Sequence, residues 1–117
     1  MAEHLITGII GEDQAAAYLQ QQGFIIRERN YRYKKAEIDL IVQAGNLLVF
    51  VEVKTRTTNK FGYPEEFVSQ KKTQLFILAA DEYVHQINWQ HDLRFDIIAI
   101  TASGNQYHIH HIEDAFH

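Results

Sequence analysis

The sequence predicts an α/β protein in which a mixed central sheet is flanked by helices, in the order helix, three strands, helix, two strands. Two long segments place apolar residues at helical spacing, one at the start of the chain and one in its second half. Short segments rich in branched apolar residues, which favour strands, lie between and after them. A chain of 117 residues is long enough to bury a real core, so we expect a single domain over residues 1–117.

The first helix is predicted over residues 3–22, with Gly23 ending it as a C-cap. Its apolar stripe consists of Leu5, Ile9, Ala16 and Leu19. Glu12 lies within that stripe, where a carboxylate is costly unless it is paired or bound to a cation. A buried acid satisfied by a backbone amide or an arginine is one reading, and membership of a metal site is the other.

Residues 24–30 are predicted to form the first strand, and the polar residues 31–36 a loop. Gly45-Asn46 suits a two-residue hairpin turn that joins the second and third strands and pairs Ala44 with Leu47. The third strand is apolar on both faces until its end, so it is predicted to be central in the sheet and covered on both sides.

Counting back from this turn brings acids and a lysine together at one end of the hairpin. Asp39 falls opposite Glu52, and Glu37 falls opposite Lys54. Directly opposed residues share a face of the sheet, whereas a slip of one residue would separate them. Such a cluster can hold a divalent metal and activate a water. Two other readings of Glu37 are that it only pairs with Lys54 or that it lies at the strand edge.

The remaining elements follow a polar loop over residues 55–63. A second helix begins at or just after Pro64 and ends near residue 85, and its apolar stripe consists of Val68, Leu75, Phe76, Ala79 and Tyr83. A lysine pair such as Lys71-Lys72 is usually part of a solvated helix face, but Lys72 falls on the same side as this stripe, which is compatible with a role in the site. Residues 93–101 and 106–112 are predicted strands, separated by a turn over residues 103–105. Arg94 and Asp96 are interpreted as a structural ion pair.

The composition excludes several classes of function. There is no cysteine, which rules out disulfides, thiolate zinc sites and thiol nucleophiles and is compatible with a reducing cytoplasm, where we place the protein. No signal peptide is visible, and no apolar run approaches the roughly 18 residues of a membrane span, so no membrane partner is expected. A net charge of −4 argues against a general nucleic-acid binder.

The basic residues are nevertheless concentrated, since ten of the eleven lie between positions 27 and 72. The densest run comprises Arg27, Arg29, Arg32, Lys34 and Lys35, with Tyr31 and Tyr33 interleaved. A local positive patch can bind phosphate even on an acidic chain, and tyrosines can stack on bases. A solubilising loop explains the same run equally well.

Three histidines close together near the end of the chain suggest a metal site at first sight. His108 and His110 share one face of the predicted last strand, whereas His111 points to the other. No acid or cysteine at a suitable spacing completes a zinc site, so surface histidines are the preferred interpretation.

As a set, the motifs resemble those of the YraN-like family of small bacterial proteins, which is placed in the PD-(D/E)XK endonuclease superfamily. The resemblance covers residues 8–100. It is carried by Gly11-Glu12, Ala15, Tyr18-Leu19, Gly23, Arg29-Asn30-Tyr31-Arg32, Glu37-Ile38-Asp39-Leu40-Ile41, Val49-Phe50-Val51-Glu52-Val53-Lys54-Thr55-Arg56, Phe61-Gly62-Tyr63-Pro64, Lys72, Tyr83 and Arg94-Phe95-Asp96. The fold implied is a restriction-endonuclease-like core, and the activity implied is metal-dependent cleavage of DNA, with branched DNA in repair or recombination as a possible substrate.

The resemblance also implies roles for individual residues. Asp39 would be the invariant metal-binding aspartate, Glu52 and Lys54 the (D/E)XK pair, and Glu12 an acid that helix one adds to the metal site, as in archaeal Holliday-junction resolvases. Mg²⁺, or Mn²⁺ in its place, is expected because the ligands are hard oxygens. The residues expected to contact DNA are Arg29, Arg32, Arg56 and Lys72. Resolvases cut symmetrically, which suggests a homodimer.

Two departures from the pattern are visible. Ala36 stands where the family usually has glycine, and no proline precedes Asp39. Neither removes a ligand. The alternative function is a binding module for nucleic acid or protein built on the nuclease fold without cleavage.

Overall fold

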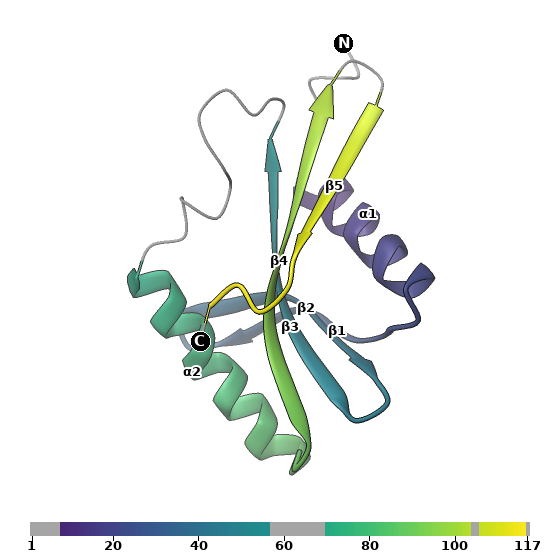
Figure 1. Cartoon of the computed structure of the whole chain (residues 1–117). Coiled ribbons are helices and arrows are strands. Elements are labelled where there is room, and N and C mark those ends of the chain that lie inside the picture. Colours follow the sequence, from purple (N-terminus) through teal and green to yellow (C-terminus); the bar gives the residue numbers. More distant parts are fainter. Residues whose placement is uncertain (1–7, 57–69, 104–105, 117) are drawn as a thin grey trace.

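A computed structural model describes residues 8–56, 70–103 and 106–116. Five strands form one sheet in the order β1-β2-β3-β4-β5, with α1 and α2 packed on opposite sides of it (Figure 1). The elements are α1 (Gly8–Gln21), β1 (Ile25–Tyr33), β2 (Ala36–Ala44), β3 (Leu47–Arg56), α2 (Gln70–Ile87), β4 (Asp92–Ser103) and β5 (Gln106–Ile112). Within the described residues, neither helix is long and apolar enough to cross a membrane.

The sheet is mixed, as predicted. The pairs β1–β2, β2–β3 and β4–β5 are antiparallel, whereas β3 and β4 are parallel. Parallel neighbours need a crossover connection, and α2 lies in the one between β3 and β4. The predicted order of elements and the central position of β3 are both confirmed.

Strand alternation divides the core into two layers. Val49 and Val51 of β3 face α1, where they pack with Leu19, whereas Leu48 and Phe50 face α2. On the α2 side, Phe76, Ala79 and Tyr83 are buried, which confirms the described part of the predicted stripe. Because both faces of β3 are buried, its long apolar run is explained.

The prediction of a loop over residues 31–36 is wrong. β1 continues to Tyr33, the chain turns at Lys34 with a φ of 56°, and β2 begins at Ala36. Tyr31 and Tyr33 pack against the core on the α2 side, which provides the apolar anchoring that the polar sequence pattern concealed. The basic run therefore lies along an edge strand.

Two turns position the sheet relative to the helices. Gly23 has a φ of 99°, and the hydrogen bonds from the N–H groups of Gly23 and Phe24 to the carbonyls of Gln20 and Leu19 close α1 in a Schellman motif. Gly45, with a φ of 58°, makes the hairpin turn and pairs Ala44 with Leu47 as predicted. The predicted starts of the two helices, and the turn at residues 104–105, lie outside the described residues.

Candidate active site

The central feature of the site is the point at which β2 and β3 separate. Their ladder runs from the hairpin turn only as far as the pair Leu40 and Val51. Beyond it, β2 stays paired with β1, and β3 stays paired with β4 (Figure 1). The predicted pairs of Asp39 with Glu52 and of Glu37 with Lys54 are therefore not formed, although the register that predicted them is correct.

The Asp39 side chain occupies the opening between these strands. Its Oδ2 accepts a hydrogen bond of 2.8 Å from the backbone N–H of Val53. This N–H belongs to the part of β3 that β2 no longer pairs with, so a carboxylate replaces a backbone partner. The hydrogen bond holds Asp39 beside the neighbouring Glu52 on β3.

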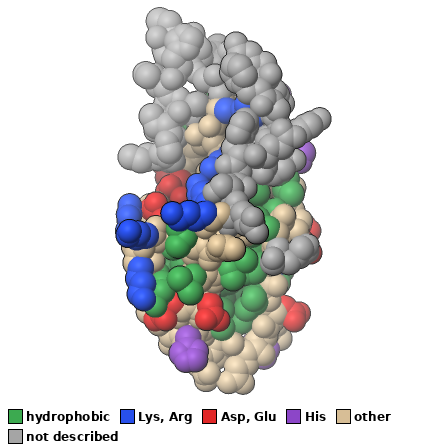
Figure 2. Space-filling model, turned by 90° about the vertical axis from the view of Figure 1, so that its left-hand side faces the viewer, with side chains coloured by type: hydrophobic (Ala, Val, Ile, Leu, Met, Phe, Trp, Pro, Cys, Tyr) green, Lys and Arg blue, Asp and Glu red, His purple; other side chains and the backbone are tan. Residues whose placement is uncertain are grey.

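A pocket of about 310 Å³ lies at this opening, on the side of the sheet that α2 covers. It is lined by Lys35, Ala36, Glu37, Asp39, Glu52, Lys72, Leu75 and Phe76. On this side of the molecule, Figure 2 shows basic side chains next to acidic ones, with an apolar surface below them. Residues from β2, β3 and α2 thus converge on one polar cavity.

Asp39 is held in an environment that disfavours its charge. The pKa of Asp39 is raised to about 7, chiefly by burial and then by the negative charge of nearby Glu52. The hydrogen bond from Val53 opposes this shift, whereas Glu12 and Glu37 add to it. A carboxyl group with such a raised pKa, in a cleft and beside other acids, is a candidate functional group.

Glu52 is the acid at the centre of the site. It is 4% exposed, and its Oε2 lies 2.7 Å from Nζ of Lys72 and 3.4 Å from Nζ of Lys54. Burial alone would lower the pKa of Lys72, but its hydrogen bond with Glu52 raises it. Burial and the neighbouring Lys72 lower the pKa of Lys54. Two lysines from different elements thus share one buried carboxylate.

Glu12 approaches the same site from α1. Its side chain is only 15% exposed and lies 3.9 Å from Nη2 of Arg29, which contacts Asp13 more closely at 2.6 Å. Glu12 does not line the pocket, but its charge acts on Asp39. Both sequence-based readings of Glu12 therefore have an observation behind them: an arginine partner and proximity to the acids.

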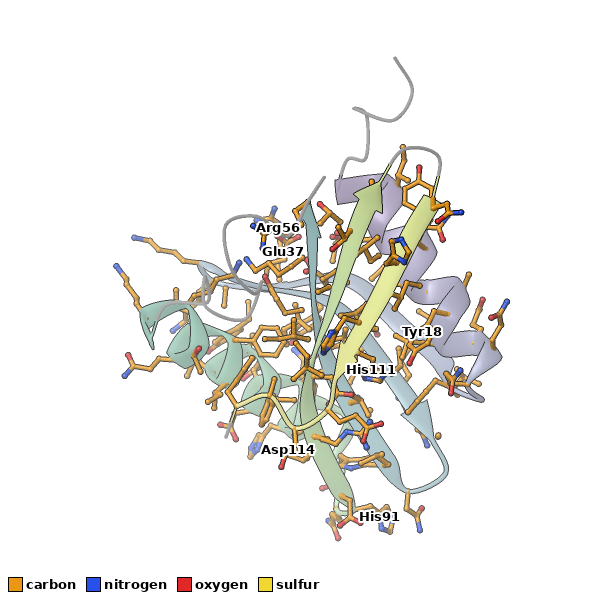
Figure 3. All side chains as sticks on the ribbon, turned by 45° about the horizontal axis from the view of Figure 1, so that its top comes forward. Tyr18, Glu37, Arg56, His91, His111 and Asp114 are labelled. Carbon is orange, nitrogen blue, oxygen red and sulfur yellow. The ribbon has the colours of Figure 1, made fainter. Side chains whose placement is uncertain are left out.

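The remaining predicted residues lie around this centre. Glu37 lines the pocket and lies 3.7 Å from Nη2 of Arg32, so it pairs with β1 rather than with Lys54. Arg56, at the end of β3, is two and four residues beyond Lys54 and Glu52 and so shares their face of the sheet. In Figure 3, Glu37 and Arg56 lie at the same end of the molecule, opposite His91.

The structure therefore brings together Asp39, Glu52 and Glu37, with Lys72 beside them and Lys54 in contact with Glu52. Arg29 and Arg32 lie on the edge strand, each next to an acid. Within the described ranges, no group of three or more histidine, cysteine, aspartate or glutamate side chains has a spacing suited to holding a metal ion.

Sequence reasoning missed a second polar cluster, on the α1 side of the sheet. Asp96 is fully buried and accepts two hydrogen bonds of 2.9 Å from Arg94, which confirms that predicted ion pair. His111 Nε2 lies 2.7 Å from Asp96, and its Nδ1 lies 2.9 Å from the Tyr18 hydroxyl. His111 is thus not a surface histidine. The backbone N–H of Asp114 also donates to Asp96.

These contacts give the buried cluster a structural role. Burial alone would raise the pKa of Asp96, but hydrogen bonds from His111, Arg94 and the Asp114 backbone lower it below its ordinary value. The segment that follows β5 is bound to β4 by the hydrogen bond from the Ala115 N–H to the Phe95 carbonyl. A signal was available in the spacing of Arg94 and Asp96, but nothing local indicated His111.

The fold and the pocket define a class of small α/β proteins in which an acid–lysine site lies where two antiparallel strands of a mixed sheet separate. The chain belongs to the uncharacterised protein family UPF0102, whose model matches residues 11–100. A UPF0102 protein of Flavobacterium psychrophilum is 46% identical over all of this chain and 98% of its own length. A relative in Cytophaga hutchinsonii is 47% identical over 92% of this chain and 95% of its own length. A relative in Phocaeicola vulgatus is 41% identical over 100% of this chain and 97% of its own length.

Proposed function

We propose that this protein is a metal-dependent nuclease of the PD-(D/E)XK type that acts on DNA. The observation that carries the proposal is the placement of Asp39 and Glu52 in one pocket, with ammonium groups from β3 and α2 on Glu52. Acids and lysines in this arrangement are the groups that phosphodiester hydrolysis needs. The resemblance to the endonuclease superfamily suggests branched DNA in repair or recombination as the substrate.

The donor set fits a hard divalent cation. Asp39 and Glu52 offer carboxylate oxygens, and the negative charge of Glu52 raises the pKa of Asp39. A cation bound between these groups would relieve that repulsion and favour both ionised forms. Asp39 and Glu52 would hold the metal, with Glu12 contributing from α1 and Glu37 from the pocket wall. Magnesium suits oxygen ligands and retains waters, and Mn²⁺ is the alternative.

When bound, the metal would supply an acidified water and polarise the scissile phosphate. The Val53 N–H fixes the orientation of Asp39. Lys54, whose pKa is lowered by burial and by Lys72, is placed to orient the water or stabilise charge on the phosphate oxygens. Lys72 and Arg56 would neutralise flanking phosphates.

A second candidate is a module that binds nucleic acid or a protein without cutting. The ion pair of 2.7 Å between Lys72 and Glu52 favours this second candidate, because the lysine already balances the charge of a carboxylate that the nuclease proposal assigns to the metal. The described part of the chain also lacks a group of three side chains arranged for a metal. The ion pair is also compatible with an enzyme in which Lys72 would leave Glu52 for a phosphate once a cation were bound.

Cleavage of labelled four-way, flapped, single-stranded and linear DNA tests the proposal, with Mg²⁺, Mn²⁺ or chelator. We expect metal-dependent cleavage that falls about 100-fold or more in Asp39→Asn and in Lys54→Met. The matched controls are Asp81→Asn and Lys71→Met, which change exposed residues of α2 outside the pocket lining. Binding without cleavage under every condition would favour the module instead. Cleavage retained in both site variants would refute the assignment.

A further inference from the structure

The face of the sheet that carries the candidate site continues beyond β3. In the register, Lys54 pairs with Ala99 of β4, and Ala99 pairs with His110 of β5. One row further along, Arg56 pairs with Thr101, and Thr101 pairs with His108. Directly paired residues share a face, so both rows lie on the same side as Glu52.

These rows have a polar or charged residue at each end and a small residue between. On β4, Ala99 is 2% exposed and is therefore covered by its neighbours, whereas Thr101 is partly exposed and offers a small polar side chain in the second row. His108 and His110 are both exposed on β5, which is an edge strand. His111 points to the opposite face, where it contacts Tyr18 and Asp96.

The dimensions of this surface suit a nucleic-acid strand. Neighbouring strands lie about 4.8 Å apart, which places His110 about 10 Å from Lys54 across the sheet. A stacked strand rises about 3.4 Å per nucleotide, so this distance corresponds to about three nucleotides. The imidazole group can donate a hydrogen bond to a phosphate oxygen and can stack on a base.

We propose that a nucleic-acid strand bound at the candidate site extends across β4 and is held at β5 by His108 and His110. The inference rests on the proposed function, because it takes nucleic acid as the ligand of that site. It identifies single-stranded or unpaired segments as the substrate portion that crosses the sheet, since duplex bases are already paired and stacked with each other. The basic run on β1 then lies at the other end of the sheet from these histidines.

Charge substitution tests this placement with a gain as well as a loss of binding. The test variant, called the β5 variant, carries His108→Lys and His110→Lys. The matched control carries His85→Lys and His91→Lys, which change exposed histidines at the end of α2 and before β4. Both variants alter net charge equally, so a general electrostatic effect would appear in both. Affinity for a labelled single-stranded oligonucleotide is measured in chelator against salt concentration, which separates binding from cleavage.

We expect the β5 variant to bind about 5-fold more tightly at low salt, as two exposed ion pairs would give. Its plot of log affinity against log salt should be steeper by about 1.4, since each new phosphate contact on a single strand adds about 0.7. The companion variant with His108→Glu and His110→Glu should bind more weakly. Equal behaviour of the β5 and control variants, or no measurable binding of DNA or RNA by the native protein, would overturn the inference.

Failure of this inference can be distinguished from failure of the proposed function. Metal-dependent cleavage with no specific effect of the β5 variant would reject the histidine contacts and leave the nuclease in place. A specific effect of the β5 variant without cleavage in any metal would support the strand path and assign the protein to the binding module.

Discussion

The packing of α1 against β3 makes a testable link between one glycine and the candidate site. Gly11 is buried directly before Glu12, and a Cβ atom added there would overlap Cγ2 of Thr55. The same Cβ would lie 3.4 Å from the Thr55 Cβ and 3.9 Å from a Val53 methyl group. The clash therefore depends on one methyl group. Removing that methyl in Thr55→Ala should make room for alanine at Gly11.

The free energies can be estimated from these contacts. Overpacking a filled core costs about 1–3 kcal/mol, and the rigid, branched Thr55 side chain favours the upper part of this range. Alanine is about 1 kcal/mol better than glycine inside a helix. Gly11→Ala should therefore destabilise the native protein by about 1–2 kcal/mol but stabilise Thr55→Ala by about 1 kcal/mol. The predicted coupling energy between the two sites is about 2–3 kcal/mol.

Urea unfolding of the native protein, the two single variants and the double variant measures this coupling. Additive effects, with Gly11→Ala equally destabilising in both backgrounds, would refute the packing argument. Where the native protein has a measurable activity, Gly11→Ala should also reduce it, because a displaced α1 carries Glu12 away from Asp39. Restored activity in the double variant would show that the position of the helix, not glycine itself, is required.

Asp96→Asn should destabilise the protein by about 3 kcal/mol, the lower end of the range for breaking a buried ion pair, since Arg94 is 22% exposed and can regain water. For a chain of this length that corresponds to a melting temperature about 12 °C lower. The control is Asp92→Asn, which changes an exposed residue. A decrease in melting temperature of less than about 4 °C for Asp96→Asn would refute this prediction. Because the pKa of Asp96 is lowered in the folded state, its stabilisation is present above the unfolded value of about 3.9 and lost as pH falls through the folded value. The stability difference between native protein and Asp96→Asn should thus shrink below about pH 4, and a difference that grew on acidification in that range would contradict the sign.

Local patterns were sufficient for the order of elements and for the hairpin register. The pairing of Ala44 with Leu47 follows from turn chemistry, and the burial of both faces of β3 follows from its continuous apolar run. The end of the ladder at Leu40 could not be read in this way. Near that point, β1 shifts register by one residue against β2 between Ile26 and Glu28, an irregularity that no local pattern indicates.

The extension of β1 and the contacts of His111 were missed for a related reason. Tyr31 packs edge-on against Tyr83 of α2, a contact between residues far apart in the chain that stabilises β1 where its own sequence is polar. The His111 side chain is only 10% exposed because β4, β5 and α1 meet there, and its partners Asp96 and Tyr18 come from different elements. Sequence periodicity identifies which face a residue occupies but not which distant side chain covers it.

The position of Lys72 explains why the fold and the candidate site depend on one another. Three residues of α2 further along the helix, Phe76, Ala79 and Tyr83, are buried against β2 and β3, and this packing fixes the first turn of α2 beside Glu52. Separation of β2 from β3 then exposes Asp39 to the same cavity. An acid from each diverging strand and a lysine from the crossover helix can meet only where the ladder ends, because a continued ladder would pair the Val53 N–H with β2 rather than with the Asp39 carboxylate. The irregularity in the sheet is therefore the structural cause of the site, and restoring regular pairing there would remove it.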